Sequence, residues 1–578
     1  MGVVVASHWR TERKVAGALV ALVCLLALSA GPASAGQKPL PRPVPVANDA
    51  LTRALARGEV TPAVYAFERA RSLFRLGAVR KEFGDVARPD PHAATLILRD
   101  LALRLGDLSP AERARAERLL ARPSDGASDP LGFGWGADES PDSPICDAHV
   151  CVHWVDFADD APNAPPPADA DTNNVPDWVE DVVQPTFATV WQKEIVDRGN
   201  PAPLSDDTSD NDGGQNEGDP NKVKLDIYLS NVGASGFFGL CTSDDPRLDE
   251  GSNYQFFDVS AYCVVDNDFG DFGTEWTPTQ FLQVTAAHEF RHASQFAEDA
   301  FEDFWLLEGE AMWMEGQVYP AITDRFDYLG RSPIRKPDRA LDHGVNNYEY
   351  GAWIFFRFLA EYFDDEAVVR ELWAYADGSG DNDGPGPDGE GPDEFSMQAA
   401  GHATSDRAVS LSAAFADFAE WNGFPAHYYD EGASYPSPVR AALYKLGRGA
   451  TTGWKAPRLR HLASSYYSFM PRDTLGRFAK LRVAVDLPSL SQKPAAVVLL
   501  FFKSGDYQVR PLALDSGGNA TRTVSFGRGV VSRVDLVLTN ASARYDLSTC
   551  WTQLTTYSCG GAVARDELRT YRFKASVR

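Results

Sequence analysis

The chain has 578 residues, enough for roughly two or three domains, and 44% of them are apolar, so it can bury real hydrophobic cores. Its formal net charge of −26 at pH 7 argues against nucleic acid as a partner. The acidity favours solubility and the binding of cations, although an acidic surface is more often simply a solvated one.

The first 35 residues have the three parts of a secretory signal. A basic start at 10–14 precedes an apolar run at 15–28 and a small-residue cleavage site at 33–35. The apolar run is short for a membrane-spanning helix, although an uncleaved anchor is the alternative. We therefore expect a secreted, extracellular protein with no membrane attachment after cleavage.

The cysteine content fits export. Cys24 leaves with the signal, and the remaining even set predicts disulfides in an oxidising compartment. A cysteine zinc site is not expected, because no C-x-x-C motif occurs. We expect sequential pairs because each pair lies within one local segment: Cys146–Cys151, Cys241–Cys263 and Cys550–Cys559.

Residues 36–135 differ in composition from the rest of the chain. A proline-rich start leads into sequence rich in Arg, Ala and Leu, with a capping box at Ser109 and Glu112, so we expect helices. A helical region between signal and main domain predicts either a prosegment that covers the site until it is removed or a permanent subdomain. Latency through a cysteine thiol is excluded because the region has none.

Residues 149–157 alternate like a strand, and we expect His153 within it to be structural. The loop after it has the ligand order of an EF-hand. Counted from Asp169, side-chain oxygens fall at positions 1, 3, 5, 9 and 12 and a main-chain carbonyl at 7. The predicted Ca²⁺ ligands are Asp169, Asp171, Asn173, Val175, Asp177 and Glu180. Asn174 replaces the usual glycine and Pro176 departs from the pattern, so a turn that caps a helix over 178–191 is the alternative.

Two acidic Gly/Pro-rich stretches, 205–220 and 377–393, predict solvated linkers, with further calcium as the alternative. Strands are expected at 222–230 and 254–265.

A helix opening at Thr277 carries the pattern H-E-x-x-H. Its capping box pairs Thr277 with Gln280. His288 and His292 lie four residues apart and therefore share one helix face, where two imidazoles can hold one Zn²⁺ at about 2.0–2.1 Å. Glu289 can serve as general base toward a water that the metal activates.

A catalytic zinc needs a third protein ligand, and Glu308 lies downstream in the stretch W-L-L-E-G-E-A-M-W-M-E. Glu308 and Glu315 share a face at helical spacing. An antiparallel second helix can therefore present Glu308 to the metal and let Glu315 bind a zinc-bound histidine from behind. Glu310 points elsewhere.

These two motifs resemble those of the glutamate-zincin (gluzincin) metallopeptidases, especially the aminopeptidase N-like pattern of H-E-x-x-H followed by W-L-N-E-G-F-A-x-x-x-E. The chain as a whole resembles uncharacterised secreted bacterial metalloproteases. The resemblance implies that His288, His292 and Glu308 bind zinc, that Glu289 is the base and that Glu315 supports a ligand. The G-x-M-E-N motif of the exopeptidases is missing upstream, which favours an endopeptidase.

The resemblance also implies an α+β fold, with a zincin-like domain over 140–450 that has a mixed-sheet upper lobe and a helical lower lobe. An edge strand of the upper lobe would pair with an extended substrate. The stretch Tyr348-Glu349-Tyr350-Gly351 is similar to Y-E-K-G of the same family, in which the tyrosine stabilises the oxyanion. The resemblance therefore assigns oxyanion stabilisation to Tyr348, with Tyr350 and His343 as the alternative residues. The structural alternative is that these tyrosines only pack in the helix.

Helices are expected from 347 to 363, at 365–376 and at 409–421. From 455 to 578 the pattern changes to short alternating strands separated by turn residues, typical of a β-sandwich. The expected strands are Leu481–Leu487, Ala496–Lys503, Tyr507–Leu514, Thr521–Phe526 and Arg533–Thr539.

The sequence therefore predicts a secreted, monomeric zinc peptidase that hydrolyses proteins or peptides. One alternative is an inactive exported binding or adhesion protein on a protease-like fold; the presence of Glu289 argues against it, since a structural zinc site does not need that residue. A zinc hydrolase of a non-peptide acyl substrate is the other.

Overall fold

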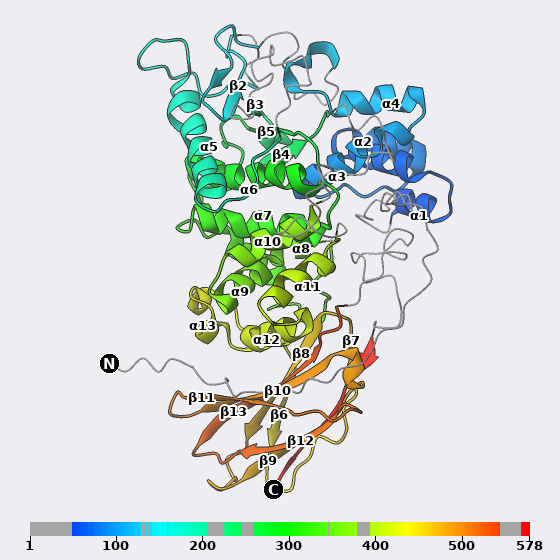
Figure 1. The fold of residues 1–578 in the computed structure, drawn as a ribbon, viewed down its shortest axis with the longest axis vertical. Coiled ribbons are helices and arrows are strands. Elements are labelled where there is room, and N and C mark those ends of the chain that lie inside the picture. Colours follow the sequence, from blue (N-terminus) through cyan, green and yellow to red (C-terminus); the bar gives the residue numbers. More distant parts are fainter. Residues whose placement is uncertain are drawn as a thin grey trace, which may run out of the picture. The chain divides into compact units, whose positions relative to one another are not determined.

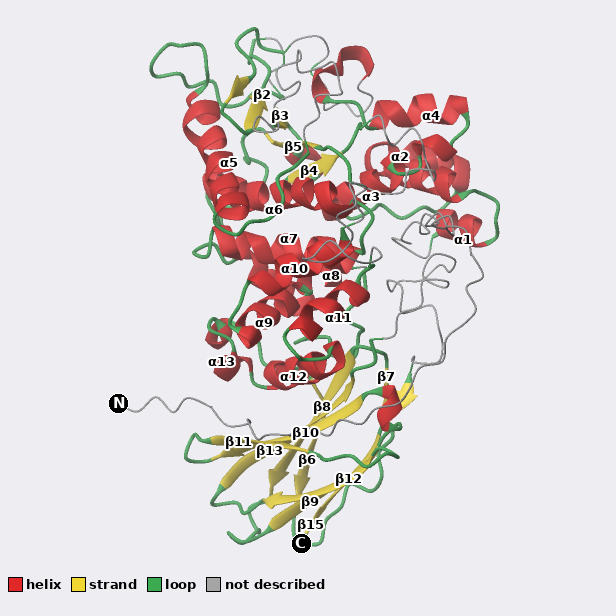
Figure 2. Cartoon of the chain, viewed as in Figure 1, coloured by secondary structure: helices red, strands yellow, loops and turns green. Residues whose placement is uncertain are grey.

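The computed structural model describes residues 49–128, 135, 139–158, 160, 162–204, 224–245, 258–344, 346–377, 394–543 and 568–578. They form helices together with several sheets, so the expected α+β class is confirmed (Figures 1 and 2). The expected signal, the loop 205–220, most of 377–393, and both Cys550 and Cys559 lie outside these residues. Within the described part, no helix has the length and apolar character that a bilayer span requires.

The N-terminal region is helical, as expected. Its capping box is formed, because the Ser109 side chain accepts from the Glu112 amide and Glu112 bonds back to Ser109. The helices are α1 (Ala50–Ala56), α2 (Pro62–Phe83), α3 (Ala94–Ala102) and α4 (Pro110–Ala116), joined by 3-10 turns that include Pro91–Ala93. Every residue of α3 is buried.

A five-stranded mixed sheet comes next, in the order β1-β2-β3-β5-β4. The inner strands β2, β3 and β5 run parallel, whereas β1 and β4 pair antiparallel at the two edges. Parallel strands covered on both faces are expected to be buried throughout, as these inner strands are. The strands are β1 (Ile145–Cys146), β2 (Val150–His153), β3 (Leu225–Ser230), β4 (Gly239–Thr242) and β5 (Tyr262–Asp266).

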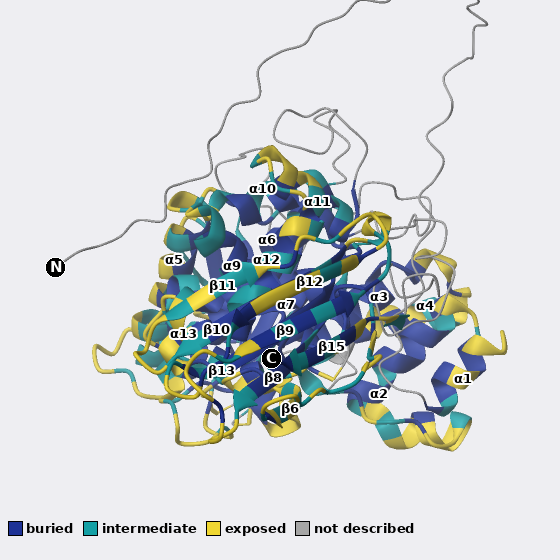
Figure 3. Cartoon of the chain, turned by 90° about the horizontal axis from the view of Figure 1, so that it is seen from below, coloured by how far each residue is buried: buried dark blue, intermediate teal, exposed yellow. Residues whose placement is uncertain are grey.

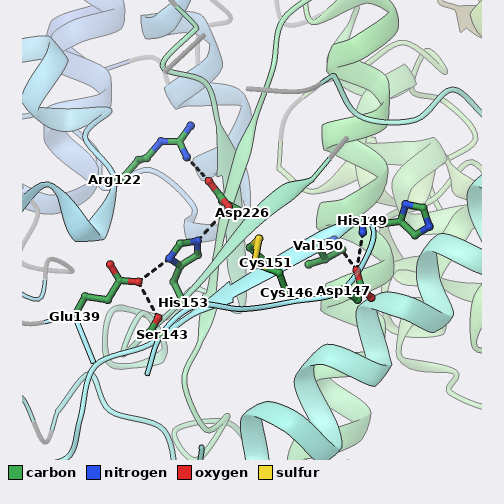
Figure 4. Close-up of a disulfide and its surroundings, with 10 residues drawn as sticks. All are labelled: Arg122, Glu139, Ser143, Cys146, Asp147, His149, Val150, Cys151, His153 and Asp226. Carbon is green, nitrogen blue, oxygen red and sulfur yellow. Dashed lines mark hydrogen bonds and ion pairs between the residues drawn. A yellow bond between two sulfur atoms is a disulfide. The ribbon is translucent and has the colours of Figure 1, made fainter. Parts of the chain in front are cut away.

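Disulfides join both edges of this sheet to their neighbours. Cys146–Cys151 links β1 to β2 (Figure 4). Cys241–Cys263 links β4 to β5, so the first two sequential pairs are formed as predicted.

His153 on β2 belongs to a buried network of charges beside the first disulfide (Figure 4). Its Nδ1 lies 2.7 Å from Glu139 Oε1 and its Nε2 lies 3.1 Å from Asp226 Oδ1. Arg122, from the N-terminal region, donates to the other oxygen of Asp226 at 2.6 Å. His153 therefore has the structural role expected of it, and the network ties the N-terminal region to the central strand.

The middle of the chain is mostly helical. α6 (Pro278–Asp299) contacts β4 and β5 on one side and α7 (Phe304–Val318) on the other (Figure 1). The capping box at Thr277 and Gln280 is present. The further helices are α5 (Gln184–Trp191, preceded by a π-helix at Trp178–Val183), α8 (Tyr348–Gly351), α9 (Trp353–Phe363), α10 (Ala367–Ala376), α11 (Met397–Asp406), α12 (Leu411–Gly423) and α13 (Pro425–Tyr428).

The C-terminal region holds two sheets that share one hydrophobic core, with orders β11-β10-β13-β8-β6 and β12-β9-β15. In Figure 3, β12 shows a long exposed stretch, whereas β9 is buried at alternate positions. The strands are β6 (Arg440–Leu446), β8 (Ala463–Pro471), β9 (Lys480–Asp486), β10 (Pro494–Phe502), β11 (Tyr507–Pro511), β12 (Asn519–Ser525), β13 (Val531–Asn540) and β15 (Arg572–Val577), with β7 (Arg458–Leu459) and β14 (Arg569–Thr570) forming a separate pair.

The boundary placed at 455 is too late by one strand. β6 begins at Arg440 and pairs in parallel with β8, so the sheet starts inside the range assigned to the preceding domain. The side chains of β6 before Leu446 are half-exposed or exposed, so its sequence lacks the apolar alternation by which the other strands were predicted.

Candidate metal centre

Two helices bring the three predicted zinc ligands together. His288 and His292 stand one turn apart on α6, and their Nε2 atoms are 3.1 Å apart. Glu308 on α7 places Oε2 at 3.2 Å from His288 Nε2 and 3.5 Å from His292 Nε2. All three residues are buried. Within the part of the chain that the structure describes, this is the one group of three or more His, Cys, Asp or Glu residues whose ligand atoms converge, all within 4.8 Å.

Each histidine is oriented by a hydrogen bond at its other ring nitrogen, Nδ1. His288 Nδ1 lies 2.8 Å from Glu315 Oε1, the contact expected from the spacing on α7. His292 Nδ1 lies 2.8 Å from Gln295 Oε1. While Glu315 is ionised it can only accept, and in that state Nδ1 of His288 carries the proton and the Nε2 lone pair faces the centre.

Gln295 was not anticipated from the sequence. It lies three residues after His292 on the same helix face, and this spacing was the only local signal. Its Nε2 donates to Glu310 Oε2 at 2.6 Å, which also accepts from Arg291 Nε at 2.6 Å. Glu310 thus lies away from the ligands, as expected, and anchors the amide that orients His292.

The donor set fits a divalent metal. Glu308 Oε1 is buried and has no hydrogen-bond partner among the described residues. Burial alone would raise the pKa of Glu308, but the neighbouring His292 and His288 lower it to about 2. A buried, ionised carboxylate beside two imidazole nitrogens is the ligand combination of a catalytic zinc site.

Glu289 lines a cavity of about 680 Å³ that also reaches one of the three ligands. His288 and Glu315 also line this cavity, so the centre can be reached from it. Burial raises the pKa of Glu289. Its Oε2 accepts a hydrogen bond from the Thr95 hydroxyl at 3.2 Å.

The remaining walls of the cavity are largely aromatic. Phe238 stacks on Phe272 with ring centres 3.9 Å apart, and Phe281 packs against both. Carboxylates of Glu275, Asp324 and Asp327 also contribute to the lining.

The assignment of Tyr348 as the residue that binds the oxyanion is not supported by its position. Its hydroxyl is 3.4 Å from the Arg339 carbonyl, its ring packs on His343, and it does not line the cavity. Tyr350 lines the cavity instead, with its ring centre 6.0 Å from that of His288. The reason is the helix start: Asn346 and Asn347 are left-handed, with φ of 63° and 58°, and α8 lasts only four residues, so periodicity did not define its facing side.

His343, the other alternative, also lies outside the cavity lining. Its Nε2 accepts from Arg339 at 2.6 Å, and burial together with that cation lowers its pKa to about 4.

The EF-hand-like loop forms a tight set of turns. Asp169 accepts from the amides of Thr172 and Asn174 at 2.7 and 3.0 Å, and both of those residues have positive φ. Asn173 donates to Glu180 Oε2 at 2.9 Å, which brings the two ends of the loop together.

The alternative of a helix cap is not what this loop forms. The Asp177 side chain accepts from the Ala170 amide at 2.9 Å and makes no cap bond to the helix that begins at Trp178. Calcium at Asp169, Asp171, Asn173, Val175, Asp177 and Glu180 stays a prediction.

Comparison with known proteins adds little. No known sequence family matches the chain, and no curated protein matches it. One solved structure that is similar in part is "a novel family GH115 4-O-Methyl-alpha-glucuronidase, BtGH115A, with specificity for decorated arabinogalactans", at 9% identity and a TM-score of 0.13. That match covers 61% of this chain and about half, 51%, of the other. A likeness this weak carries no argument, so the function rests on the geometry of the centre.

Proposed function

We propose that the chain is a secreted zinc-dependent endopeptidase of the gluzincin type, with a zincin-like catalytic domain over residues 140–450. The observation that carries the proposal is the convergence of His288, His292 and Glu308, together with a cavity that His288 and Glu289 both line. Both histidines are fixed from behind, as ligands of a catalytic metal are. A structural zinc site would not need Glu289.

When bound at this centre, zinc supplies Lewis-acid polarisation of a substrate carbonyl and lowers the pKa of a water. The Glu289 carboxylate takes a proton from the attacking water while the oxygen of that water bonds to the substrate's carbonyl carbon. Glu289 then returns the proton to the amine nitrogen as the carbon–nitrogen bond breaks. Its position in the cavity wall and its raised pKa suit both roles.

Tyr350 is the candidate for oxyanion stabilisation, in place of Tyr348. It is a neutral phenol next to His288, and burial raises its pKa far above the ordinary value, so it remains a proton donor. Its hydroxyl donates a hydrogen bond to the His92 carbonyl, so this hydrogen bond must break before the hydroxyl can donate to a substrate.

The cavity favours a peptide substrate with large apolar side chains, because Phe238, Phe272 and Phe281 form one wall. Gly239 at the start of the edge strand β4 also lines it. Further along this edge, the Cys241 amide is bound to Thr95 at 3.0 Å, so that N–H is not free to pair with a substrate.

The test is the Glu289→Gln variant of the full chain. Glu289 bonds to no ligand atom of the centre, so we expect the variant to bind zinc like the wild type and to lose casein hydrolysis by about 10²- to 10⁴-fold. Wild-type protein treated with a chelator should lose activity as well. Casein hydrolysis by Glu289→Gln at the wild-type rate would disprove the assigned base, and a zinc-loaded wild type without hydrolytic activity would favour the binding protein.

A further inference from the structure

The N-terminal region reaches the candidate site through one short stretch, the 3-10 turn Pro91–Ala93 and the start of α3. Thr95 lies on α3, which packs on β4 (Figure 1). The Thr95 hydroxyl accepts from the Cys241 amide at 3.0 Å and is 3.2 Å from Glu289 Oε2. The hydroxyl oxygen accepts a hydrogen bond from the amide, and the hydroxyl donates its own hydrogen bond to the Glu289 carboxylate.

The same stretch holds the second candidate catalytic group. The Tyr350 hydroxyl donates to the main-chain carbonyl of His92. The His92 ring packs near the Tyr350 ring, with centres 5.9 Å apart, and its Nδ1 lies 3.0 Å from Asp90. Within the short stretch 92–95, His92 thus contacts Tyr350 and Thr95 contacts Glu289.

The described residues of this region form part of the cavity wall and do not fill the cavity. Pro91 and His92 line the cavity together with the aromatic wall, and His288 and Glu289 remain in its lining. A prosegment that blocks a site would fill this space.

The region is also continuous with the core of the rest of the protein. Leu96, Ile97 and Leu98 belong to the same hydrophobic core as α6 and α7. Arg99 donates to the Glu302 carbonyl at 2.7 Å, and the Tyr262 hydroxyl donates to the Leu120 carbonyl at 2.7 Å. Buried Arg122 pairs with Asp226 on the central strand. Removing residues 49–128 would expose this core and leave Asp226 without its arginine.

We propose that the N-terminal helical region is a permanent part of the active site, in which Thr95 is a positioning residue for Glu289. This inference rests on the proposed function, because Thr95 has a positioning role only if Glu289 is the general base. Of the two interpretations of residues 36–135, the inference favours the subdomain, and it is argued from the described residues 49–128.

The test compares Thr95→Val with Thr95→Ser in the full chain. Valine keeps the shape and removes the hydroxyl, so we expect kcat on a peptide substrate to fall about 10- to 100-fold with KM within about threefold and zinc content unchanged. Serine keeps the hydroxyl and should restore kcat to within about threefold. Arg99→Met is the matched control: it removes a hydrogen bond from α3 to the Glu302 carbonyl and leaves the contacts of Thr95 in place, so it should lower Tm and leave kcat within about twofold.

N-terminal sequencing of the active species completes the test and does not depend on how the variants fold. We expect the active species to retain Thr95. An active species that begins after Thr95, or a Thr95→Val enzyme with wild-type kcat, would overturn the inference. Failure of the proposed function gives a different result, a wild type no more active than Glu289→Gln.

Discussion

The contact between His288 and Glu315 allows a quantitative prediction about zinc affinity. Glu315→Leu removes the acceptor that lies 2.8 Å from His288 Nδ1. A buried donor left without a partner costs about 1–3 kcal/mol. Since about 1.4 kcal/mol corresponds to a tenfold change in binding, zinc should bind about 10- to 100-fold more weakly. Glu315→Gln keeps an acceptor oxygen and should lose less.

Competition with a zinc chelator of known affinity at fixed pH measures this loss. The matched control is Glu298→Gln, which changes a buried carboxyl on α6 that pairs with Arg291 at 3.3 Å. Glu298 contacts none of the three ligands, so zinc affinity should stay within about twofold. If Glu315→Leu binds zinc as tightly as the wild type, or if Glu298→Gln weakens binding equally, the support assigned to Glu315 is wrong.

The site and the fold support three further predictions. Tyr350→Phe should lower kcat by about tenfold or more, whereas Tyr348→Phe should leave it within about twofold, because only Tyr350 lines the cavity; steady-state kinetics of both variants decides this. Removing zinc with 1,10-phenanthroline should abolish hydrolysis, and stoichiometric Zn²⁺ but not Ca²⁺ should restore it; activity that survives complete zinc removal would contradict the proposal. Burial would lower the pKa of His153, but its bonds to Asp226 and Glu139 raise it to about 9, and the rise from 6.5 corresponds to about 3 kcal/mol of stability. Because the folded-state pKa is the higher one, this stability is fully present below pH 6.5 and is lost as the pH rises through about 9. The difference in unfolding free energy between wild type and His153→Gln across that pH range measures it. An NMR titration of the His153 imidazole should show no pKa near 6.5.

The convergence of the three candidate ligands was predictable because it depends on local geometry. The capping box at Thr277 sets where α6 begins, and the four-residue spacing of the histidines puts them on one face. The spacing of Glu308 and Glu315 on one helix face placed both toward the histidines, as the distances to His288 show. Alternation likewise located most strands of the C-terminal sheets, such as β9 and β13.

Other parts of the site depend on contacts that carry no local signal. Thr95 and Glu289 are 194 positions apart, and nothing in the residues around Thr95 marks it as a partner of a catalytic base. Tyr350 faces the cavity because two left-handed asparagines turn the chain before a helix of only four residues. Motif resemblance pointed to Tyr348, but the direction of so short a helix is set by the loop before it.

X-ray absorption at the zinc edge of the purified full chain tests the central claim most directly. We expect one zinc per chain with four nitrogen or oxygen neighbours at about 2.0–2.2 Å, two of them imidazoles, and the loss of one oxygen neighbour in Glu308→Ala. A spectrum dominated by sulfur at about 2.3 Å, or one unchanged by Glu308→Ala, would contradict a centre built from His288, His292 and Glu308.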